Sequence, residues 1–195
     1  MSTLTDSFNS PADTITPTLS VRISGTKEWR LNGQLHREDG PAEELISGRK
    51  KWYHHGQLHR INAPAIEYAD GSKEWYRQGQ RHREDGPAIE YANGHKEWYR
   101  QGQLHREEGP SFEGADGYKA WYQNGKRHRA DGSAVERTDG TQEWWLNDQE
   151  LTEDQFDQWR EEQAKIRQTE IDLFTTGLDK PHPTPGKLIL RAPSR

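Results

Sequence analysis

Short aromatic and branched runs, bounded by residue pairs that contain glycine, follow one another along most of the chain. In the stretch Lys73–His95, the runs Glu74–Tyr76 and Ala88–Tyr91 alternate with the pairs Gln78–Gly79 and Asn93–Gly94. Runs of this length and composition between turn pairs are typical of β-strands and hairpins. The pattern therefore predicts an all-β chain of short antiparallel hairpins.

The pattern recurs with a period of 23 residues, which predicts a repeat array. Lys73–His95 is the best-formed unit and serves as its consensus. In such an array each unit packs on its neighbours, so stability comes from stacking rather than from one globular centre. The columns with this spacing are Trp29, Trp52, Trp75, Trp98, Trp121 and Trp144; Gly33, Gly56, Gly79, Gly102 and Gly125; His36, His59, His82, His105 and His128; and Arg37, Arg60, Arg83, Arg106 and Arg129.

The strand register follows if Gln78–Gly79 and Asn93–Gly94 are both two-residue hairpin turns, because pairs can then be counted outward from each turn. One face is expected to carry Ile-Trp-His rows, and the other face Tyr, Leu and Glu-Arg pairs. The predicted pairs are Trp75 with His82, Glu74 with Arg83, Ile89 with Trp98, Glu90 with Glu97, and Tyr91 with Lys96. The predicted rows are Ile66-Trp75-His82, Ile89-Trp98-His105 and Phe112-Trp121-His128, and the structural core is expected to include Trp29, Trp52, Trp144, His36 and His59 as well.

The chain divides into four predicted segments. Residues 1–18, rich in Ser, Thr and Pro, are expected to form a flexible tail, and residues 19–151 form the array. Residues 152–178 are predicted to be an α-helix that caps the last strand or binds a partner. Residues 179–195 form a Pro-rich tail, in which Leu188–Leu190 either adds a strand or remains unpaired.

The helix prediction has a start signal and an apolar face. Thr152 followed by Gln155 fits a capping box. One face of the helix is expected to carry Phe156, Trp159, Ile166 and Leu173.

Composition narrows the class of protein. The 27 basic and 32 acidic residues give a net charge of -5, which provides no general attraction to nucleic acid or an anionic membrane. Leu, Ile, Val and Phe are scarce, so 8 Trp and 7 Tyr must supply the buried surface. No long apolar run or signal-peptide layout is present, and we expect a cytoplasmic protein, in the host cytoplasm if a phage encodes it.

The repeat resembles a known family. Its 23-residue period, its Trp-Tyr-x-x-Gly-x-x-His core and its closing Asp-Gly or Asn-Gly are similar to MORN repeats. The similarity is greater to the bacterial and phage MORN-variant proteins, some of which are classed as antitoxins, and it covers about Leu19–Leu151. The chain departs from the usual unit at His82-Arg83, where MORN repeats usually have His-Gly. The resemblance implies a β-hairpin array that inhibits another protein.

No catalytic, cofactor or metal site is predicted. Equivalent histidines in successive units are expected to lie about 10 Å apart, too far to share one metal ion. The pair His54-His55 is a separate local feature that offers at most a weak adventitious site. Acid-base combinations recur in every unit, whereas an active site is a single asymmetric constellation.

A binding role is the remaining interpretation. Lys51 and Ala120 stand at the position where other units have a glutamate, such as Glu74, that is predicted to pair with the arginine. Arg60 and Arg129 are therefore expected to be unpaired and free for partner contacts. The aromatic candidates in the middle of the array are Trp75, Tyr76, Trp98, Tyr99, Trp121 and Tyr122.

We therefore expect a non-enzymatic protein-binding inhibitor, which is an antitoxin, an immunity protein or a phage factor that blocks a host defence protein. Two alternatives remain open at this point. One is a scaffold associated with membrane phospholipid. The other is a structural or virion component that assembles through strand edges or through the C-terminal helix.

Overall fold

The computed structural model describes residues 16–175, which belong to two compact units. The first unit, Met1–Leu151, contains the described strands, and the second, Thr152–Arg195, contains the helix. Apart from positions 16–18, the two predicted tails lie outside the described residues, and so does the strand considered at Leu188–Leu190.

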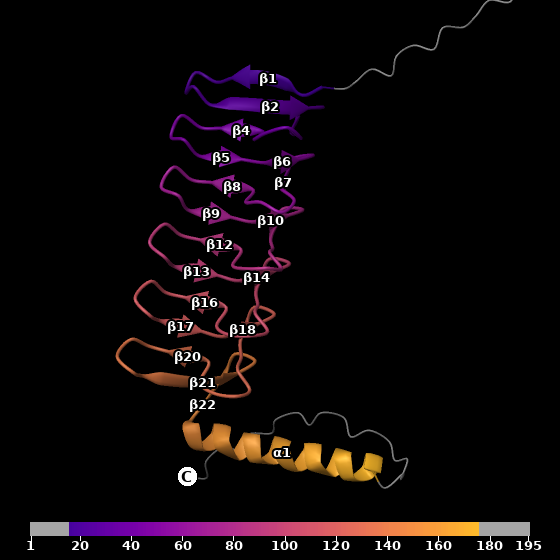
Figure 1. The fold of residues 1–195 in the computed structure, drawn as a ribbon, viewed down its shortest axis with the longest axis vertical. Coiled ribbons are helices and arrows are strands. Elements are labelled where there is room, and N and C mark those ends of the chain that lie inside the picture. The colour runs from indigo at the N-terminus through magenta and orange to yellow at the C-terminus, as the bar shows by residue number, and fades with distance from the viewer. Residues whose placement is uncertain (1–15, 176–195) are drawn as a thin grey trace, which may run out of the picture. The chain divides into compact units, whose positions relative to one another are not determined.

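The first unit is built on an antiparallel sheet of 14 short strands that follow one another in chain order (Figure 1). The predicted all-β arrangement of repeated antiparallel hairpins is therefore confirmed. Strand β3 (Gln34–Leu35) pairs with β2 beside the main path. In spatial order the others are β1 (Thr18–Val21), β2 (Lys27–Leu31), β4 (Glu43–Glu44), β5 (Lys50–Lys51), β8 (Ile66–Glu67), β9 (Lys73–Glu74), β12 (Ile89–Glu90), β13 (Lys96–Glu97), β16 (Phe112–Glu113), β17 (Lys119–Ala120), β20 (Val135–Glu136), β21 (Gln142–Leu146) and β22 (Gln149–Leu151).

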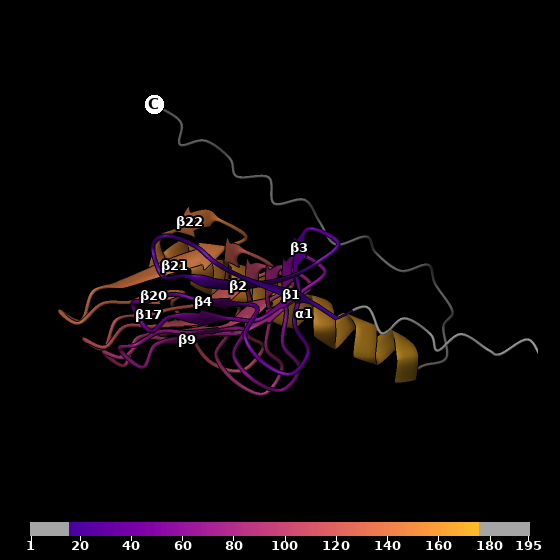
Figure 2. The ribbon, with the colours of Figure 1, turned by 90° about the horizontal axis from the view of Figure 1, so that it is seen from above.

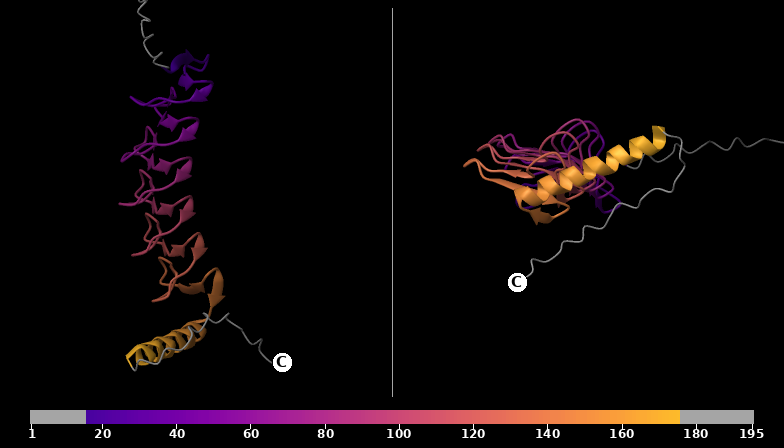
Figure 3. Two further views of the ribbon diagram at one scale, coloured as in Figure 1. Left: turned by 90° about the vertical axis from the view of Figure 1, so that its right-hand side faces the viewer. Right: turned by 90° about the horizontal axis from the view of Figure 1, so that it is seen from below.

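Between successive strand pairs the chain leaves this sheet and forms a two-stranded side hairpin. Along the stack, the side hairpins lie on one side and the loops of the long sheet on the other (Figure 1), and Figures 2 and 3 show the same stack from other directions. The side hairpins are β6 (Tyr53–His54) with β7 (Gln57–Leu58), β10 (Tyr76–Arg77) with β11 (Gln80–Arg81), β14 (Tyr99–Arg100) with β15 (Gln103–Leu104), and β18 (Tyr122–Gln123) with β19 (Lys126–Arg127). We number the units from the sequence as first (27–49), second (50–72), third (73–95), fourth (96–118) and fifth (119–141).

The side hairpins have the predicted two-residue turns. Gln78 and Gly79 both have positive φ, 52° and 78°, as a type I′ turn requires. Tyr76 pairs with Arg81 across this turn. The N–H groups of His82, His105 and His128 donate to the carbonyls of Trp75, Trp98 and Trp121 at 3.0 to 3.1 Å, so the predicted Trp-His neighbours are confirmed.

The register across the other loop differs from the prediction by one residue. Ile89 pairs with Glu97 instead of Trp98, and Glu90 pairs with Lys96 instead of Glu97. The predicted pairing of Tyr91 with Lys96 is wrong for the same reason.

The cause is a loop of three residues in place of two. The N–H of Tyr91 donates to the carbonyl of His95 at 2.9 Å, which leaves Ala92, Asn93 and Gly94 in the loop. Only Gly94 has a positive φ, and the Asn93 side chain accepts a hydrogen bond from the N–H of His95 at 3.0 Å. This is the form in which a type I turn is followed by one left-handed residue.

A slip of one residue exchanges the faces of a strand, so the predicted rows Ile66-Trp75-His82, Ile89-Trp98-His105 and Phe112-Trp121-His128 are wrong in their first member. The Ile and Phe side chains instead share a row with the residue that precedes each tryptophan. Along the sheet this row reads Ile66, Glu74, Ile89, Glu97, Phe112, Ala120 and Val135.

The most buried positions form a column of small residues. The carbonyl of Ala88, for example, accepts the N–H of Trp75 at 2.8 Å. Ala88 and its equivalents in the column have no accessible surface, so a larger side chain would not fit there. Ala92 and the other loop residues, by contrast, are exposed. This column was not predicted from the sequence, although its residues have the same 23-residue spacing as the tryptophans. Its members are Ala42, Ala65, Ala88, Ser111 and Ala134.

The second unit contains helix α1 (Glu153–Thr175). Its predicted capping box is confirmed, because the N–H of Thr152 donates to Gln155 Oε1 at 3.0 Å and the N–H of Gln155 donates to Thr152 Oγ1 at 3.2 Å. On the predicted apolar face, Phe156 is buried and lies 5.8 Å from Trp159 between ring centroids. Whether the helix acts as a cap stays a prediction. Within residues 16–175 no helix combines the length and apolar character needed to cross a membrane.

Candidate functional site

An arginine holds each unit together through three or four kinds of contact, and we call this arrangement the arginine clip; Arg83 in the third unit makes all four. The guanidinium carbon of Arg83 lies 4.0 Å from the ring centroid of Trp75. The same side chain donates to the carbonyl of Pro87 at 3.2 Å, to Glu90 Oε1 at 2.8 Å and to Asp85 Oδ1 at 2.9 Å. The stacked pairs Arg37–Trp29, Arg60–Trp52, Arg106–Trp98 and Arg129–Trp121 repeat the cation–π contact at 3.9 to 4.1 Å.

The prediction that Arg60 and Arg129 are unpaired is wrong. Arg60 forms an ion pair with Glu67 at 2.7 Å, and Arg129 forms one with Glu136 at 3.0 Å. The partner glutamate lies seven residues after the arginine in the same unit. The substitutions at Lys51 and Ala120, which suggested free arginines, do not affect these pairs. Both side chains therefore serve the fold as clips.

The predicted pair of Glu74 with Arg83 is also wrong, because Glu74 belongs to a different network. It accepts hydrogen bonds from the hydroxyls of Tyr68 at 2.6 Å and Tyr76 at 2.8 Å, and from Arg81 at 3.3 Å. Burial, together with the hydrogen bond to Glu74, raises the pKa of Tyr68 to about 12. This network fixes the hydroxyl groups of Tyr68 and Tyr76.

The histidine column joins successive units. His82 Nδ1 accepts a hydrogen bond from the N–H of Gln101, in the next side hairpin, at 3.2 Å. An accepting nitrogen carries no proton, so Nδ1 is the unprotonated nitrogen of the ring in this bond. The histidine column is thus bonded to the turn of the following unit. The other such bonds run to His36 from His55, to His59 from Gln78 and to His105 from Asn124, each at 3.1 Å.

A groove of about 590 Å³ lies between the second and third units. It brings together three of the predicted partner residues, Arg60, Trp75 and Tyr76. Ile61 also lines the groove, and 76% of its surface is exposed. The groove therefore combines an exposed aliphatic side chain, an aromatic pair and a clip arginine.

Ile61 is a departure from the repeat that the sequence analysis did not single out. The equivalent positions in the other units are Glu38, Glu84, Glu107 and Ala130. Asn62, which follows it, adopts a φ of 56° where the third unit has Asp85. Ile61 could have been found by aligning the units of the sequence with one another.

The remaining predicted partner residues lie in the fourth and fifth units and are half-buried. Trp98 and Trp121 lie under clip arginines. Tyr99 donates to Glu97 at 2.8 Å, and burial with this hydrogen bond raises its pKa to about 12. The Tyr122 hydroxyl accepts a hydrogen bond from an arginine at 3.1 Å. These side chains do not line the groove between the second and third units.

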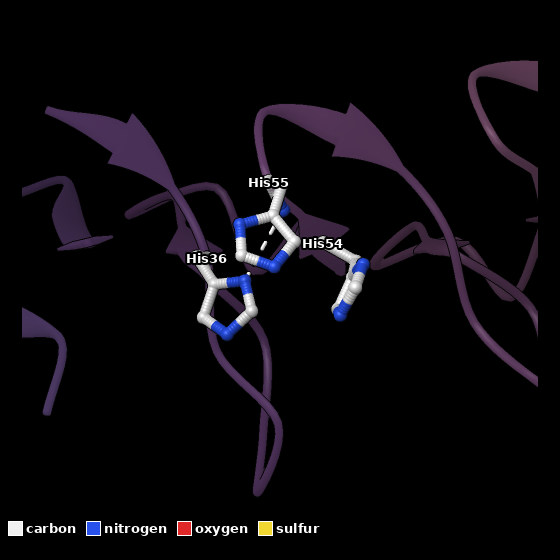
Figure 4. Close-up of side chains that lie close together, drawn as sticks. All are labelled: His36, His54 and His55. Atoms are coloured by element: carbon white, nitrogen blue, oxygen red, sulfur yellow. Dashed lines mark hydrogen bonds between the residues drawn. The ribbon is translucent and has the colours of Figure 1, made fainter. Parts of the chain in front are cut away.

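A histidine cluster lies between the first two units (Figure 4). Sequence analysis predicted no metal site and allowed only a weak one at His54-His55; the structure adds His36 to this pair. Ring centroids are 4.9 Å apart for His36 and His54, 4.5 Å for His36 and His55, and 4.3 Å for His54 and His55. His36 is buried, whereas the other two are exposed.

Comparison with known proteins gives no match: none was found in a scan against protein-family models or in a search of curated proteins. The function is therefore inferred from the surfaces described above.

Proposed function

We propose that the chain is a MORN-like protein with a 23-residue repeat that acts without catalysis, by binding another protein. The specific form we favour is an inhibitor, which is an antitoxin, an immunity protein or a phage factor directed against a defence protein. The resemblance of the repeat to MORN-variant proteins supports this choice. Blocking a partner requires a complementary surface rather than a reacting group.

The observation that carries the proposal is the groove at Ile61. Aromatic side chains at the centre of a contact, with arginine beside them, are typical of the residues that dominate protein–protein binding energy, and an aliphatic side chain can serve as an anchor among them. Here Ile61, Trp75 and Tyr76 supply the apolar part. Arg77 and Glu84 line the same groove and supply a charged rim.

The arginine clips favour binding because they fix the side chains around the groove beforehand. Arg83 stacks on the ring of Trp75, and Arg60 is held by Glu67 and by the carbonyl of Pro64 at 3.1 Å. Side chains that are already ordered lose little conformational entropy when a partner binds. A groove built from such residues is suited to a tight, specific complex.

The test compares the full chain with two variants of one residue type. Ile61→Asp places a charge in the groove, and Ile46→Asp places the same charge at an equally exposed isoleucine, 83% exposed, that does not line it. A tagged full chain is expected to retain one protein at equal stoichiometry from its native host. With that protein purified, we expect Ile61→Asp to weaken binding by roughly tenfold or more, which is about 1.4 kcal/mol, and Ile46→Asp to leave it unchanged.

Two results would contradict the proposal. If the wild-type chain retains no protein above an untagged control, the inhibitor function is wrong. If Ile61→Asp and Ile46→Asp bind the partner equally well, the groove is not the binding surface.

Assembly through a strand edge is a second candidate, which the exposure of β1 favours. All four residues of this strand are exposed, and among the described strands it pairs only with β2. Leu19 and Val21 have 50% and 62% of their surface exposed. An unpaired edge with apolar side chains can add a strand from another chain. Light scattering that shows mass increasing with protein concentration would favour this candidate.

A further inference from the structure

The histidine cluster offers three imidazoles from two successive units at one point of the surface. His36 comes from the first unit, His54 ends β6 in the second unit, and His55 begins the turn that follows. One nitrogen from each ring lies within 4.8 Å of the other two (Figure 4). Imidazole nitrogen is a preferred ligand for zinc, copper and nickel. We infer that His36, His54 and His55 form a binding site for a divalent transition metal ion, with Zn²⁺ as the ion that suits it best.

Small side-chain rotations bring the cluster to coordination distance. Tetrahedral Zn²⁺ with bonds of about 2.0 to 2.1 Å places ligand nitrogens about 3.3 Å from each other. His54 and His55 are exposed, and within residues 16–175 no hydrogen bond is formed by their ring nitrogens. Both rings are thus free to turn toward His36. Water completes the fourth position, as it does in zinc sites with three protein ligands.

His36 Nδ1 can coordinate the metal ion if it gives up one hydrogen bond. Its Nδ1 accepts the N–H of His55 at 3.1 Å, and a neutral imidazole has a single in-plane lone pair. The metal ion takes that lone pair in place of the amide proton. The N–H it releases lies in an exposed turn, where water accepts it. The metal ion then provides the link between the first and second units that the hydrogen bond provides in the metal-free chain.

The surroundings of His36 support its role as a metal ligand beside the geometry of the cluster. Burial lowers the pKa of His36, and the adjacent His55 and His54 lower it further, which favours the unprotonated form that a metal ligand needs. Glu38 Oε1 lies 3.8 Å from His36 Nε2, near the other ring nitrogen but beyond hydrogen-bond distance.

This arrangement occurs once in the array. In the third and fourth units the residues equivalent to His54 and His55 are Arg77-Gln78 and Arg100-Gln101, and in the fifth unit they are Gln123-Asn124. The turn folds with each of these pairs, so the fold does not require histidine there. The second unit therefore carries two imidazoles beyond what the repeat needs, placed beside a third.

The double variant His54→Arg/His55→Gln provides the test, because it installs the turn pair of the third and fourth units. We expect the full untagged chain to bind one Zn²⁺ in isothermal titration calorimetry. The double variant should bind it roughly tenfold more weakly or worse. Zn²⁺ is also expected to raise the midpoint of thermal unfolding of the wild-type chain and not that of the variant.

His95→Ser is the matched control, because it removes a histidine outside the cluster and installs the residue of the second unit, Ser72. It should bind Zn²⁺ like the wild type. Equal affinity of all three proteins would overturn the proposal, since other donors would then hold the ion. Failure of the wild-type chain to bind would overturn it as well.

A transplant tests whether the arrangement itself makes the site. Arg100→His/Gln101→His places two imidazoles beside His82, which accepts the N–H of Gln101 as His36 accepts that of His55. We expect this variant to bind two Zn²⁺ ions. A folded variant that still binds one ion would refute the three-imidazole arrangement as the basis of binding.

Discussion

The arginine clip makes a quantitative prediction for Arg106→Ala. The Arg106 guanidinium carbon lies 3.9 Å from the Trp98 ring centroid, and the side chain donates to the carbonyl of Pro110 at 2.9 Å and to Glu113 at 2.8 Å. Its side chain is 30% exposed. Arg100→Ala is the matched control, because Arg100 also pairs with a glutamate seven residues later but is 60% exposed.

The expected loss follows from these contacts. A cation–π contact contributes about 0.5 to 1 kcal/mol, and a hydrogen bond from a charged donor contributes about 1.5 to 3 kcal/mol. The ion pair with Glu113 is partly exposed, so it adds about 0.2 to 1 kcal/mol. Arg106→Ala is therefore expected to lower the free energy of unfolding by about 2 to 5 kcal/mol. Arg100→Ala removes a single exposed ion pair and should lower it by less than about 1 kcal/mol.

Urea unfolding, followed by tryptophan fluorescence and circular dichroism, measures the difference. For an m value of about 2 kcal/mol/M, Arg106→Ala should lower the midpoint by about 1 to 2.5 M, and Arg100→Ala by less than about 0.5 M. Equal shifts for the two variants would refute the clip as a source of stability. Agreement between the two signals is needed, because repeat arrays can unfold in parts.

Three further predictions concern the histidines, the alanine column and the helix. Burial lowers the pKa of His36 and His59 in the folded chain. Their contribution to stability is therefore present above their pKa in the unfolded chain, about 6.5, and is lost as the pH falls through their lower pKa values in the folded chain. A midpoint of thermal unfolding that does not fall between about pH 7 and pH 5 would contradict this. Ala88→Leu is expected to destabilise by about 1 to 3 kcal/mol through overpacking, whereas Ala92→Leu, in an exposed loop, should change the urea midpoint little. Thr152→Ala removes the helix cap at a loss of about 1 kcal/mol, visible as reduced helical circular dichroism, and unchanged helicity would count against the capping box.

The strand pairing shows where prediction from sequence succeeds and where it stops. Gln78–Gly79 was predicted correctly, because a type I′ turn fixes a two-residue loop. Asn93–Gly94 has the same kind of sequence but lies in a three-residue loop, in which Asn93 caps the N–H of His95 with its side chain. An Asn-Gly pair is compatible with both loops, and only the closing hydrogen bonds distinguish them.

The partners of the charged residues could not be obtained by counting pairs. Counting outward from Gln78–Gly79 assigned Arg83 to Glu74, but the Arg83 N–H donates to the carbonyl of Tyr99 in the next unit, and the Arg83 side chain donates to Glu90. The missing glutamates at Lys51 and Ala120 therefore carried no information about Arg60 or Arg129.

The histidine cluster could not be predicted, because His36 meets His54 and His55 only through the stacking of two units. The sequence indicated the local pair, and the third imidazole lies 19 residues before His55. Positions that depart from the repeat can be found by comparing the units with one another, and Ile61 and the two turn histidines are such positions, although Ile61 was not predicted.

The bonds between units have a consequence for the length of the protein. Each unit is tied to the next by the same three bonds, as when Arg83 N–H donates to Tyr99 O, Gly102 N–H to Arg81 O and Gln101 N–H to His82 Nδ1. Because these bonds join adjacent units, a gene duplication or deletion of one whole unit would leave every kind of contact intact. The number of units is therefore open to evolution and to engineering, so the length of the array can change in steps of one unit. Insertions that are not whole units would break the registers on both sides and should be rejected.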